Sequence, residues 1–415
     1  MSDFRFGLEE EYFIVDRRSG TVCCSPPVGF MRASKRKLGP SLMYELLQSQ
    51  IEVATHPHSC ADDARSQLSY FRTTLSEVGK TFNVGIVAAG SHPLAFPMEQ
   101  RVTQKRRYEK IIDDLGMVAL ANPLCGLHVH VEVPEPDRRV DLMYRLAPFL
   151  PLFLALSTSS PFWSGCETGL LGYRNAANDM MPRSGLPETF QSLADYQSYV
   201  QALVETGIIP DSTHIWWALR PSLKHPTLEL RICDCCTSVD DAIAIASFYR
   251  AIVRHLLGKP HVNSRRDAVS RALIAENLWR AQRYGLSGTL IDERTRRTLP
   301  FEAMLARLVA DLAADIAALG IEREIAHLRV IALRGTSAHR QLSLYRDLRN
   351  QGAPQGASMR TVSQWLQDST ESGDFMPPRT PNSQHEPQQS CQEPDYPARI
   401  QRHPSTSSGV VRLTA

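Results

Sequence analysis

The sequence predicts an α+β fold, and three observations support this class. Most strand-like runs fall within residues 1–235, whereas residues 239–350 are rich in Ala, Leu and Arg with helical spacing. A block of strands followed by a block of helices is typical of an α+β domain. Within the strand-like runs, apolar residues alternate with Glu, His and Arg. Because side chains alternate across a strand, the sheet is expected to have one apolar and one charged face.

The strand predictions rest on runs in which polarity alternates with a period of two residues. These runs are residues 7–15, 50–54, 127–133 and 228–233. In residues 127–133 the odd positions are all apolar, and His128, His130 and Glu132 project together from the other face. The charged side chains expected on polar strand faces are Glu9, Glu11, Glu52, His128, His130, Glu132, Glu229 and Arg231.

Helix signals dominate the second half of the chain. Ser238 is placed to cap a helix over residues 239–257, with two aspartates in its first turn and a glycine after its end. Ser264 or Asn263 is expected to cap the next helix, which ends near residue 284. Further helices are predicted over residues 61–81, 105–115, 139–157, 193–206, 301–319, 322–333 and 338–350. Their apolar stripes are interpreted as core packing.

The chain is predicted to comprise a catalytic domain, residues 1–373, and a tail, residues 374–415. The tail contains seven prolines, many Ser, Gln and Asn residues, and few large apolar side chains. Such a segment cannot bury enough apolar surface to offset the entropy lost on ordering it. The tail is therefore expected to be disordered.

Composition limits the classes of function and location. The 415 residues are 43% hydrophobic and 22% charged, with a formal net charge of +2. This balance gives no support for nucleic acid or an anionic membrane as the main partner. We expect no signal peptide, and no run approaches the roughly 20 apolar residues of a membrane helix. The nine scattered cysteines do not form a disulfide framework, so a cytoplasmic location is expected.

Three consecutive glutamates, Glu9, Glu10 and Glu11, stand within an otherwise apolar run. A strand with this content is costly unless its charges are neutralised. An antiparallel sheet with one wet face would show the same alternation without any chemistry. However, the polar positions are Glu, His and Arg almost without Lys, which favours a binding site. Several carboxylates with a histidine suit Mg²⁺ or Mn²⁺ better than zinc.

Arginines supply the complementary charge. Arg107 lies at the start of a predicted helix, and Arg174, Arg220 and Arg231 lie near loops or strand ends. Because arginine donates bidentate hydrogen bonds to carboxylates and phosphates, a substrate carrying both groups is expected. The sequence contains no P-loop, no dinucleotide-binding glycine motif and no serine nucleophile elbow.

A series of sequence blocks, in order along the chain, resembles the type 2 glutamate–cysteine ligases, also called carboxylate–amine ligases. The opening block, residues 7–16, has the sequence GLEEEYFIVD. The later blocks are residues 50–55, 126–131, 159–163, 216–217, 220–221, 227–231 and 276–281. The resemblance extends over about residues 4–370, which covers nearly everything except the predicted tail.

The resemblance implies a glutamine-synthetase-like fold, with a curved, mostly antiparallel sheet that holds metal on its concave face and is backed by helices. It also implies an ATP-dependent ligase with Mg²⁺, or alternatively Mn²⁺. In the family, ATP phosphorylates the γ-carboxylate of glutamate, and cysteine displaces phosphate from the acyl phosphate to give γ-glutamylcysteine. A homodimer is a further expectation from the family.

The matching positions also imply roles for individual residues. The implied metal ligands are Glu9, Glu11, Glu52, His128 and Glu229. Arg231 is expected to reach the transferring phosphate, and Glu45 is a candidate acid for the metal or amine site. The candidates for binding substrate or phosphate are Arg107, Arg174 and Arg220.

Three alternatives remain open at this point. Ala218 follows Trp216-Trp217 where the family often carries aspartate, so the ligase could act on a different acid or amine. The H-x-H spacing of His128 and His130 also occurs in barrel metallohydrolases. Finally, a non-enzymatic nucleotide-binding protein could use the same scaffold, because fold does not fix function.

Overall fold

The computed structural model describes residues 3–120, 123–264 and 267–378, which belong to one compact unit, Met1–Pro378. This unit extends a few residues beyond the predicted boundary at residue 373. The indole Nε1 of Trp365 donates to the carbonyl of Met376 at 2.7 Å, and its ring packs edge-on against Phe375. The predicted tail from residue 379 onward lies outside the described residues.

A seven-stranded sheet forms the centre of the unit, and every strand pair in it is antiparallel. The strand order is β10 (Leu219–Pro221), β11 (Thr227–Asp234), β5 (Gly126–Glu132), β1 (Phe6–Asp16), β3 (Gln50–Ala54) and β2 (Leu42–Tyr44). The seventh strand, β4 (Val84–Val87), pairs with the second half of β1. The four predicted strand runs are confirmed as β1, β3, β5 and β11. Strand β4 was missed because its side chains are all buried and show no alternation.

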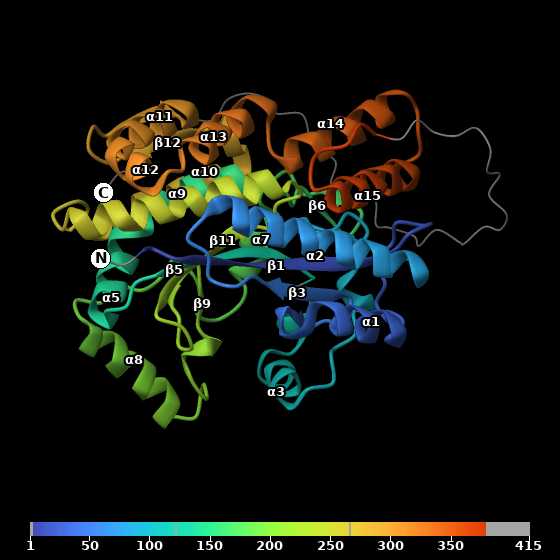
Figure 1. Ribbon diagram of the computed structural model, residues 1–415, viewed down its shortest axis with the longest axis horizontal. Helices are drawn as coiled ribbons and strands as arrows, with labels where there is room; N and C mark the ends of the chain where they lie inside the picture. Colours follow the sequence, from blue (N-terminus) through green and yellow to red (C-terminus); the bar gives the residue numbers. More distant parts are fainter. Residues whose placement is uncertain (1–2, 121–122, 265–266, 379–415) are drawn as a thin grey trace, which may run out of the picture. The chain divides into compact units, whose positions relative to one another are not determined.

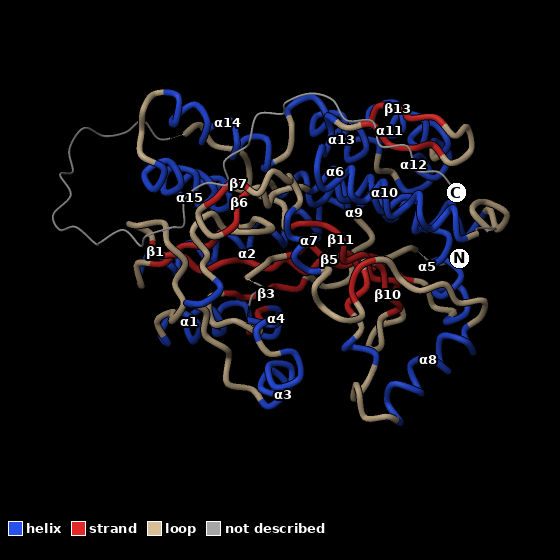
Figure 2. Tube along the Cα trace, turned by 180° about the vertical axis from the view of Figure 1, so that it is seen from behind, coloured by secondary structure: helices blue, strands red, loops and turns tan. Residues whose placement is uncertain are grey.

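Helices cover one face of this sheet, as Figure 1 shows for α2 (Ala61–Thr81) and α9 (Val239–Gly258). Helices α6 (Leu150–Ser157) and α15 (Gln355–Ser372) also contact the strands. Behind α9 lie α12 (Ala313–Leu319) and α13 (Glu322–Arg334). On the opposite side, helices α3 (Arg106–Leu115) and α8 (Leu193–Glu205) lie away from this helical layer (Figures 1 and 2). The sheet therefore has one face in the apolar core and one that is not covered by this layer.

The alternation along β1 divides its three glutamates between the two faces. Glu10 points into the helical layer, where it is fully buried and bound by Arg72 of α2, itself 1% exposed. Glu9 and Glu11 point to the other face. The hypothesis that a metal neutralises the whole run is therefore wrong for Glu10, because a buried guanidinium already compensates its charge.

The predicted helices are largely present, with local corrections. The predicted helix over residues 139–157 divides into α5 (Pro136–Leu146), a 3₁₀ turn and α6, because Pro148 and Pro151 lack the N–H that a continuous helix needs. The predicted helix 301–319 breaks at Leu312 into α11 (Phe301–Asp311) and α12. Helix α10 (Ala268–Tyr284) is capped by Asp267, whose carboxylate accepts from the Ser270 N–H at 2.8 Å, and not by Ser264 or Asn263.

The remaining elements are short or peripheral. The other helices are α1 (Val28–Leu38), α4 (Met117–Leu120), α7 (Tyr173–Asn178) and α14 (Ser337–Asn350). Three two-stranded pairs are β6 (Phe162–Trp163) with β7 (Cys166–Glu167), β8 (Ser184–Gly185) with β9 (Trp216–Trp217), and β12 (Thr289–Asp292) with β13 (Arg297–Pro300). Helices α1 and α15 were not predicted from the sequence.

One stretch of the described chain, Pro136–Ser157, is long and apolar enough to cross a membrane, with a mean hydropathy of 1.4. However, 78% of its most apolar window is buried inside the protein. A core helix of a soluble protein passes the same test, so this stretch is weak evidence for a membrane span.

Candidate active site on the polar face of the sheet

The antiparallel register brings the charged side chains of neighbouring strands into rows across the sheet. The directly opposed pairs are Glu229 with His130, Glu9 with His128, and Glu11 with Glu52. Side chains opposed in this way lie on the same face with their Cβ atoms about 5 Å apart. The five predicted metal ligands therefore share one surface, drawn from four strands.

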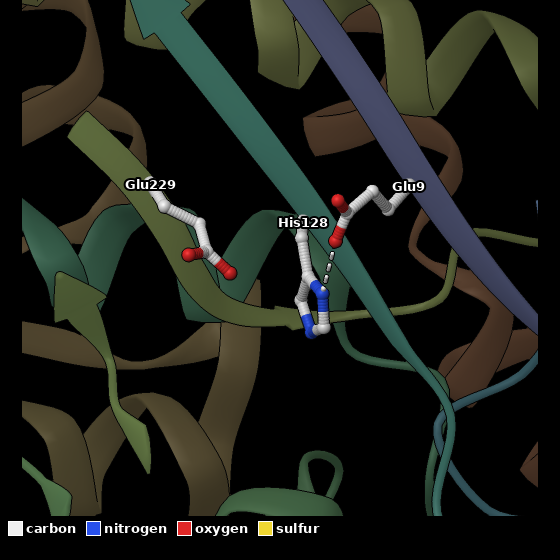
Figure 3. A group of neighbouring side chains, drawn as sticks. All are labelled: Glu9, His128 and Glu229. Atoms are coloured by element: carbon white, nitrogen blue, oxygen red, sulfur yellow. Dashed lines mark hydrogen bonds and ion pairs between the residues drawn. The ribbon is translucent and has the colours of Figure 1, made fainter. Parts of the chain in front are cut away.

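The first cluster consists of Glu9, His128 and Glu229, whose potential ligand atoms lie within 4.8 Å of one another. Figure 3 shows the carboxylates of Glu9 and Glu229 on either side of the His128 imidazole. The Nδ1 atom of His128 lies 3.2 Å from Glu9 Oε2. His130, which was noted on this face but not assigned a role, brings its Nε2 atom to 3.3 Å from Glu9 Oε1. It should therefore be counted with the cluster.

The charge states in this cluster favour cation binding. Burial raises the pKa of Glu9, but hydrogen bonds from His128 and His130 outweigh it and hold that pKa well below its usual value. Burial, aided by the charge of Arg231, lowers the pKa of His128. The Nε2 atom of His128 is buried and has no hydrogen-bond partner among the described residues. A neutral imidazole with an unused nitrogen beside a carboxylate is a suitable metal ligand.

The second cluster consists of three carboxylates, Glu11, Glu45 and Glu52, again within 4.8 Å. Glu45 reaches the cluster from the loop that follows β2. Burial raises the pKa of Glu11, and burial together with the charges of Glu9 and Glu45 raises the pKa of Glu52 well above its usual value. Three oxygen-rich groups that repel one another are the donor set expected for a hard divalent cation.

Gly126 lies where the two clusters meet. Its N–H donates to Glu11, and a Cβ at this position would lie 2.2 Å from Arg174 Nη2 and 3.0 Å from His128 Nε2. Any other residue would fill the space shared by a carboxylate, an imidazole and a guanidinium. The glycine thus leaves room for the Arg174 guanidinium beside the two clusters.

Two arginines bind the carboxylate of Glu229, one at each oxygen. Arg220 donates to Glu229 Oε2 through Nε at 3.1 Å and Nη2 at 2.8 Å, and Arg231 Nη1 donates to Oε1. These charges lower the pKa of Glu229 strongly, although burial opposes the change. Arg220 directs its remaining bonds to main-chain carbonyls, so it holds Glu229 in place. A cation at Glu229 would require Arg231 to turn toward another anion.

The other predicted arginines differ in placement. Arg174 lies in the first turn of α7, is 5% exposed, and donates to the carbonyls of Arg231 and Ile232 at 3.3–3.4 Å. Arg107 is exposed on α3 and makes no ion pair with either cluster among the described residues; its charge adds to burial in lowering the pKa of His214. The structure therefore brings Arg174 to the site and leaves Arg107 outside the clusters.

A cavity of about 270 Å³ opens beside Arg174 and Arg231. Its other lining residues include Trp216, Trp279, Leu278, Asn175, Asp179 and Gln282. Burial raises the pKa of Asp179 to about 6. Aromatic walls with a few polar groups suit a flat heteroaromatic ring. The sequence did not indicate the lining residues Asn175, Asp179 and Gln282, because they lie on helices and a turn without a distinctive pattern. Trp216 and Trp279 did fall within the sequence blocks that resemble the family.

Residues 5–364 match the model of the glutamate–cysteine ligase family 2. The chain belongs to this family. It is 45% identical over 372 residues to a Bradyrhizobium diazoefficiens protein named "Putative glutamate--cysteine ligase 2", covering 90% of this chain and 85% of the relative. A protein of the same name from Rhodospirillum rubrum is 42% identical over 363 residues, with 86% and 93% covered. The predicted family is thereby confirmed.

Solved structures support the fold. The glutamate–cysteine ligase of Francisella tularensis, solved with AMP, superposes with a TM-score of 0.62 at 14% identity, covering 89% of this chain and 92% of that protein. The bifunctional glutathione synthetase of Pasteurella multocida gives a TM-score of 0.65 at 15% identity, covering 89% of this chain and 52% of that longer protein. The α+β class with a mostly antiparallel sheet is confirmed, and these likenesses show the fold alone.

Proposed function

We propose that this chain is an ATP-dependent ligase that joins the γ-carboxylate of glutamate to the amine of cysteine. The observation that carries the proposal is the pair of adjoining carboxylate clusters on the polar sheet face of a glutamate–cysteine ligase family member. The charged surface, the neighbouring arginines and the cavity together match a substrate set of nucleotide, acid and amine.

The donor set fits a divalent cation, with Mg²⁺ as the expected ion and Mn²⁺ as the alternative. Glu11, Glu45 and Glu52 would hold one ion through oxygen atoms alone. Glu9, His128 and Glu229 form the second candidate group, and its imidazole is better suited to Mn²⁺. A bound cation would supply charge neutralisation for the phosphate oxygens and the acceptor carboxylate. We place this site on the concave face of a glutamine-synthetase-like sheet.

The arginines would bind and orient the anionic groups of the nucleotide. Arg231 has its guanidinium between Glu229 and His128, so it can exchange its bond to Glu229 for a phosphate oxygen. Arg174 lies beside the same space at Gly126. The cavity with Trp216 and Trp279 would hold the adenine ring, because Arg174 and Arg231 also line it. Arg220 would act indirectly, by holding Glu229.

The proposed reaction has two steps. First, a carboxylate oxygen of glutamate forms a bond to the γ-phosphorus of ATP while the bond to ADP breaks, which gives an acyl phosphate. Next, the amine nitrogen of cysteine bonds to the acyl carbon, the carbon–oxygen bond to phosphate breaks, and the nitrogen loses a proton. Positioning and charge stabilisation supply most of the catalysis in phosphoryl transfer.

The test is phosphate release from ATP by the purified protein with Mg²⁺, using amino acids added singly and in pairs. Release that requires glutamate together with cysteine is the expected result. Release with a different acid or amine would correct the substrates and keep the reaction class. No release with any pair, despite tight binding of Mg·ATP, would overturn the proposal in favour of a binding protein. Zinc in the purified protein would favour the H-x-H metallohydrolase instead.

The predicted cytoplasmic location and homodimer remain predictions. Ala218 stands where the family often carries aspartate, so the acceptor amine is the first substrate to vary in this assay.

A further inference from the structure

Asp234 is a buried acid at the end of β11 that the proposed reaction does not use. Its side chain is inaccessible to solvent. Its Oδ2 atom accepts hydrogen bonds from the Ser159 N–H at 2.9 Å and the Ser160 hydroxyl at 2.6 Å. Its Oδ1 atom is buried and has no hydrogen-bond partner among the described residues. Burying a carboxylate without using both oxygens is costly, so a structural reason for its presence is required.

Ser160 connects this carboxylate to the first turn of α7. Its hydroxyl accepts from the Arg174 N–H at 2.9 Å, and its carbonyl accepts from the Tyr173 N–H at 3.2 Å. The N-cap residue of α7, Gly172, has no side chain with which to bind these N–H groups. Because the first N–H groups of a helix need partners, Ser160 replaces the missing cap from outside the helix. Asp234 in turn fixes the Ser160 hydroxyl.

The side chain of Arg174 also brings its charge near this carboxylate. Burial raises the pKa of Asp234 to about 6, and the charge of Arg174 opposes this rise. The guanidinium itself has only long hydrogen bonds, of 3.3–3.4 Å, to main-chain carbonyls of β11. Attraction to a buried anion is strong where water is excluded. The backbone of Arg174 is therefore held through Ser160, and its guanidinium is attracted by the carboxylate of Asp234.

Close packing restricts both side chains to these positions. A Cβ at Gly90 would lie 2.5 Å from Cγ of Asp234, just as one at Gly126 would lie 2.2 Å from Arg174 Nη2. The acid and the arginine each occupy space that a glycine leaves free. Helix α7 also carries Asn175 and Asn178, which line the cavity beside Arg174. Any shift of Asp234 or Ser160 would thus reach one wall of the candidate active site.

We propose that Asp234 is a positioning residue that, through Ser160 and its own charge, sets Arg174 for binding the phosphate groups of the nucleotide. The inference rests on the proposed function for the identity of the ligand. The contacts that carry it, from β11 through residue 160 to α7, belong to the fold and do not depend on that identity.

The experiment compares Mg·ADP affinity, measured by calorimetry, in the wild type, Asp234→Asn, Arg174→Gln and the double variant. The asparagine oxygen can still accept both hydrogen bonds, so the substitution removes the charge and keeps the link to Ser160. We expect each single variant to weaken ADP binding about tenfold, and the double variant to bind no more weakly than Arg174→Gln. Unchanged affinity in Asp234→Asn, or additive losses in the double variant, would overturn the proposal.

Two further proteins separate positioning from general destabilisation. Asp241→Asn removes another buried acid, one paired with Arg334 and His327 outside the site, and should leave ADP affinity unchanged. If Asp234→Asn does not fold, Ser160→Ala cuts the link to α7 and should weaken ADP binding in the same direction. A folded Ser160→Ala protein with wild-type affinity would overturn the proposal. The binding measurement does not require turnover. If the wild type binds Mg·ADP but releases no phosphate with glutamate and cysteine, the proposed function fails while the positioning role of Asp234 is still tested.

Discussion

Neighbouring glutamates on β1 should give opposite phenotypes when each is changed to glutamine. Glu10 is fully buried on the apolar face, where Arg72 donates to its two oxygens at 2.7 and 3.0 Å and Tyr12 donates to one of them. Arg72 also binds the carbonyls of Cys236 and Thr237, so it cannot follow a change in its partner. The substitution Glu10→Gln therefore leaves a buried guanidinium without its anion.

The expected magnitude follows from this burial. Breaking a buried ion pair by removing one charge costs about 3–5 kcal/mol. A folded protein typically has about 5–15 kcal/mol of stability in total, so Glu10→Gln should lose a large share of it. Glu11 differs, because burial and the charge of Glu45 raise its pKa, although His128, Arg174 and the Gly126 N–H oppose this rise. Glu11→Gln removes one of three mutually repelling carboxylates, so the free energy of unfolding should not fall.

The assays are urea unfolding followed by circular dichroism, and Mn²⁺ binding by calorimetry. Glu10→Gln should be destabilised yet bind Mn²⁺ normally wherever it is folded. Glu11→Gln should keep its stability and bind Mn²⁺ at least about tenfold more weakly, since even outer-shell changes have effects of this size. Glu132→Gln is the matched control, because Glu132 ends β5 on the polar face and pairs with exposed Arg5. Equal destabilisation of Glu10→Gln and Glu11→Gln, or loss of Mn²⁺ binding in folded Glu10→Gln, would refute the assignment of the two faces.

Three further predictions concern the site and the chain end. Arg231→Ala should lower the rate of phosphate release by about 10²–10³-fold without loss of fold, and a wild-type rate would show that another group stabilises the phosphate. Because the pKa of Glu52 is raised well above its usual value, protons compete with the cation for this carboxylate as pH falls. Mn²⁺ affinity should therefore decline in mildly acidic buffer, and it should decline less steeply with pH in Glu52→Gln. An equal change of Mn²⁺ affinity with pH in both proteins would contradict the role of Glu52. Truncation after Pro378 should leave turnover and thermal stability unchanged, whereas truncation after Asp374 should lower stability, because Phe375 and Met376 contact Trp365. Equal stability of the two truncated proteins would show that these contacts contribute little.

Local pattern was sufficient to predict the polar strand faces. The period-two alternation placed Glu9 and Glu11 together, and His128 with His130, because a strand alternates its side chains whatever lies around it. The same rule separates Glu10 from its neighbours, but only the fold could supply Arg72 as its partner. Arg72 lies 62 positions away on a helix, so the residues beside Glu10 in the sequence do not indicate it.

Arrangements that depend on distant segments meeting in space could not be predicted. Glu45 was a candidate acid for the metal or amine site, but it joins Glu11 and Glu52 only because β2 pairs with β3. Asp234 showed no pattern beyond the end of a strand, and its link to Arg174 passes through Ser160, 74 residues earlier in the chain. The cavity likewise combines residues from α7, β9, β11 and α10.

The sequence by itself determined the family, the α+β class, the strands β1, β3, β5 and β11, and the charged residue types on their polar faces. These properties depend on local alternation and on ordered sequence blocks, both of which are carried by neighbouring residues. The tertiary structure decided which charges are compensated inside the protein and which are left for a ligand. That distinction depends on burial and on partners remote in sequence, which arise only when the strands are registered and the helices are packed against them.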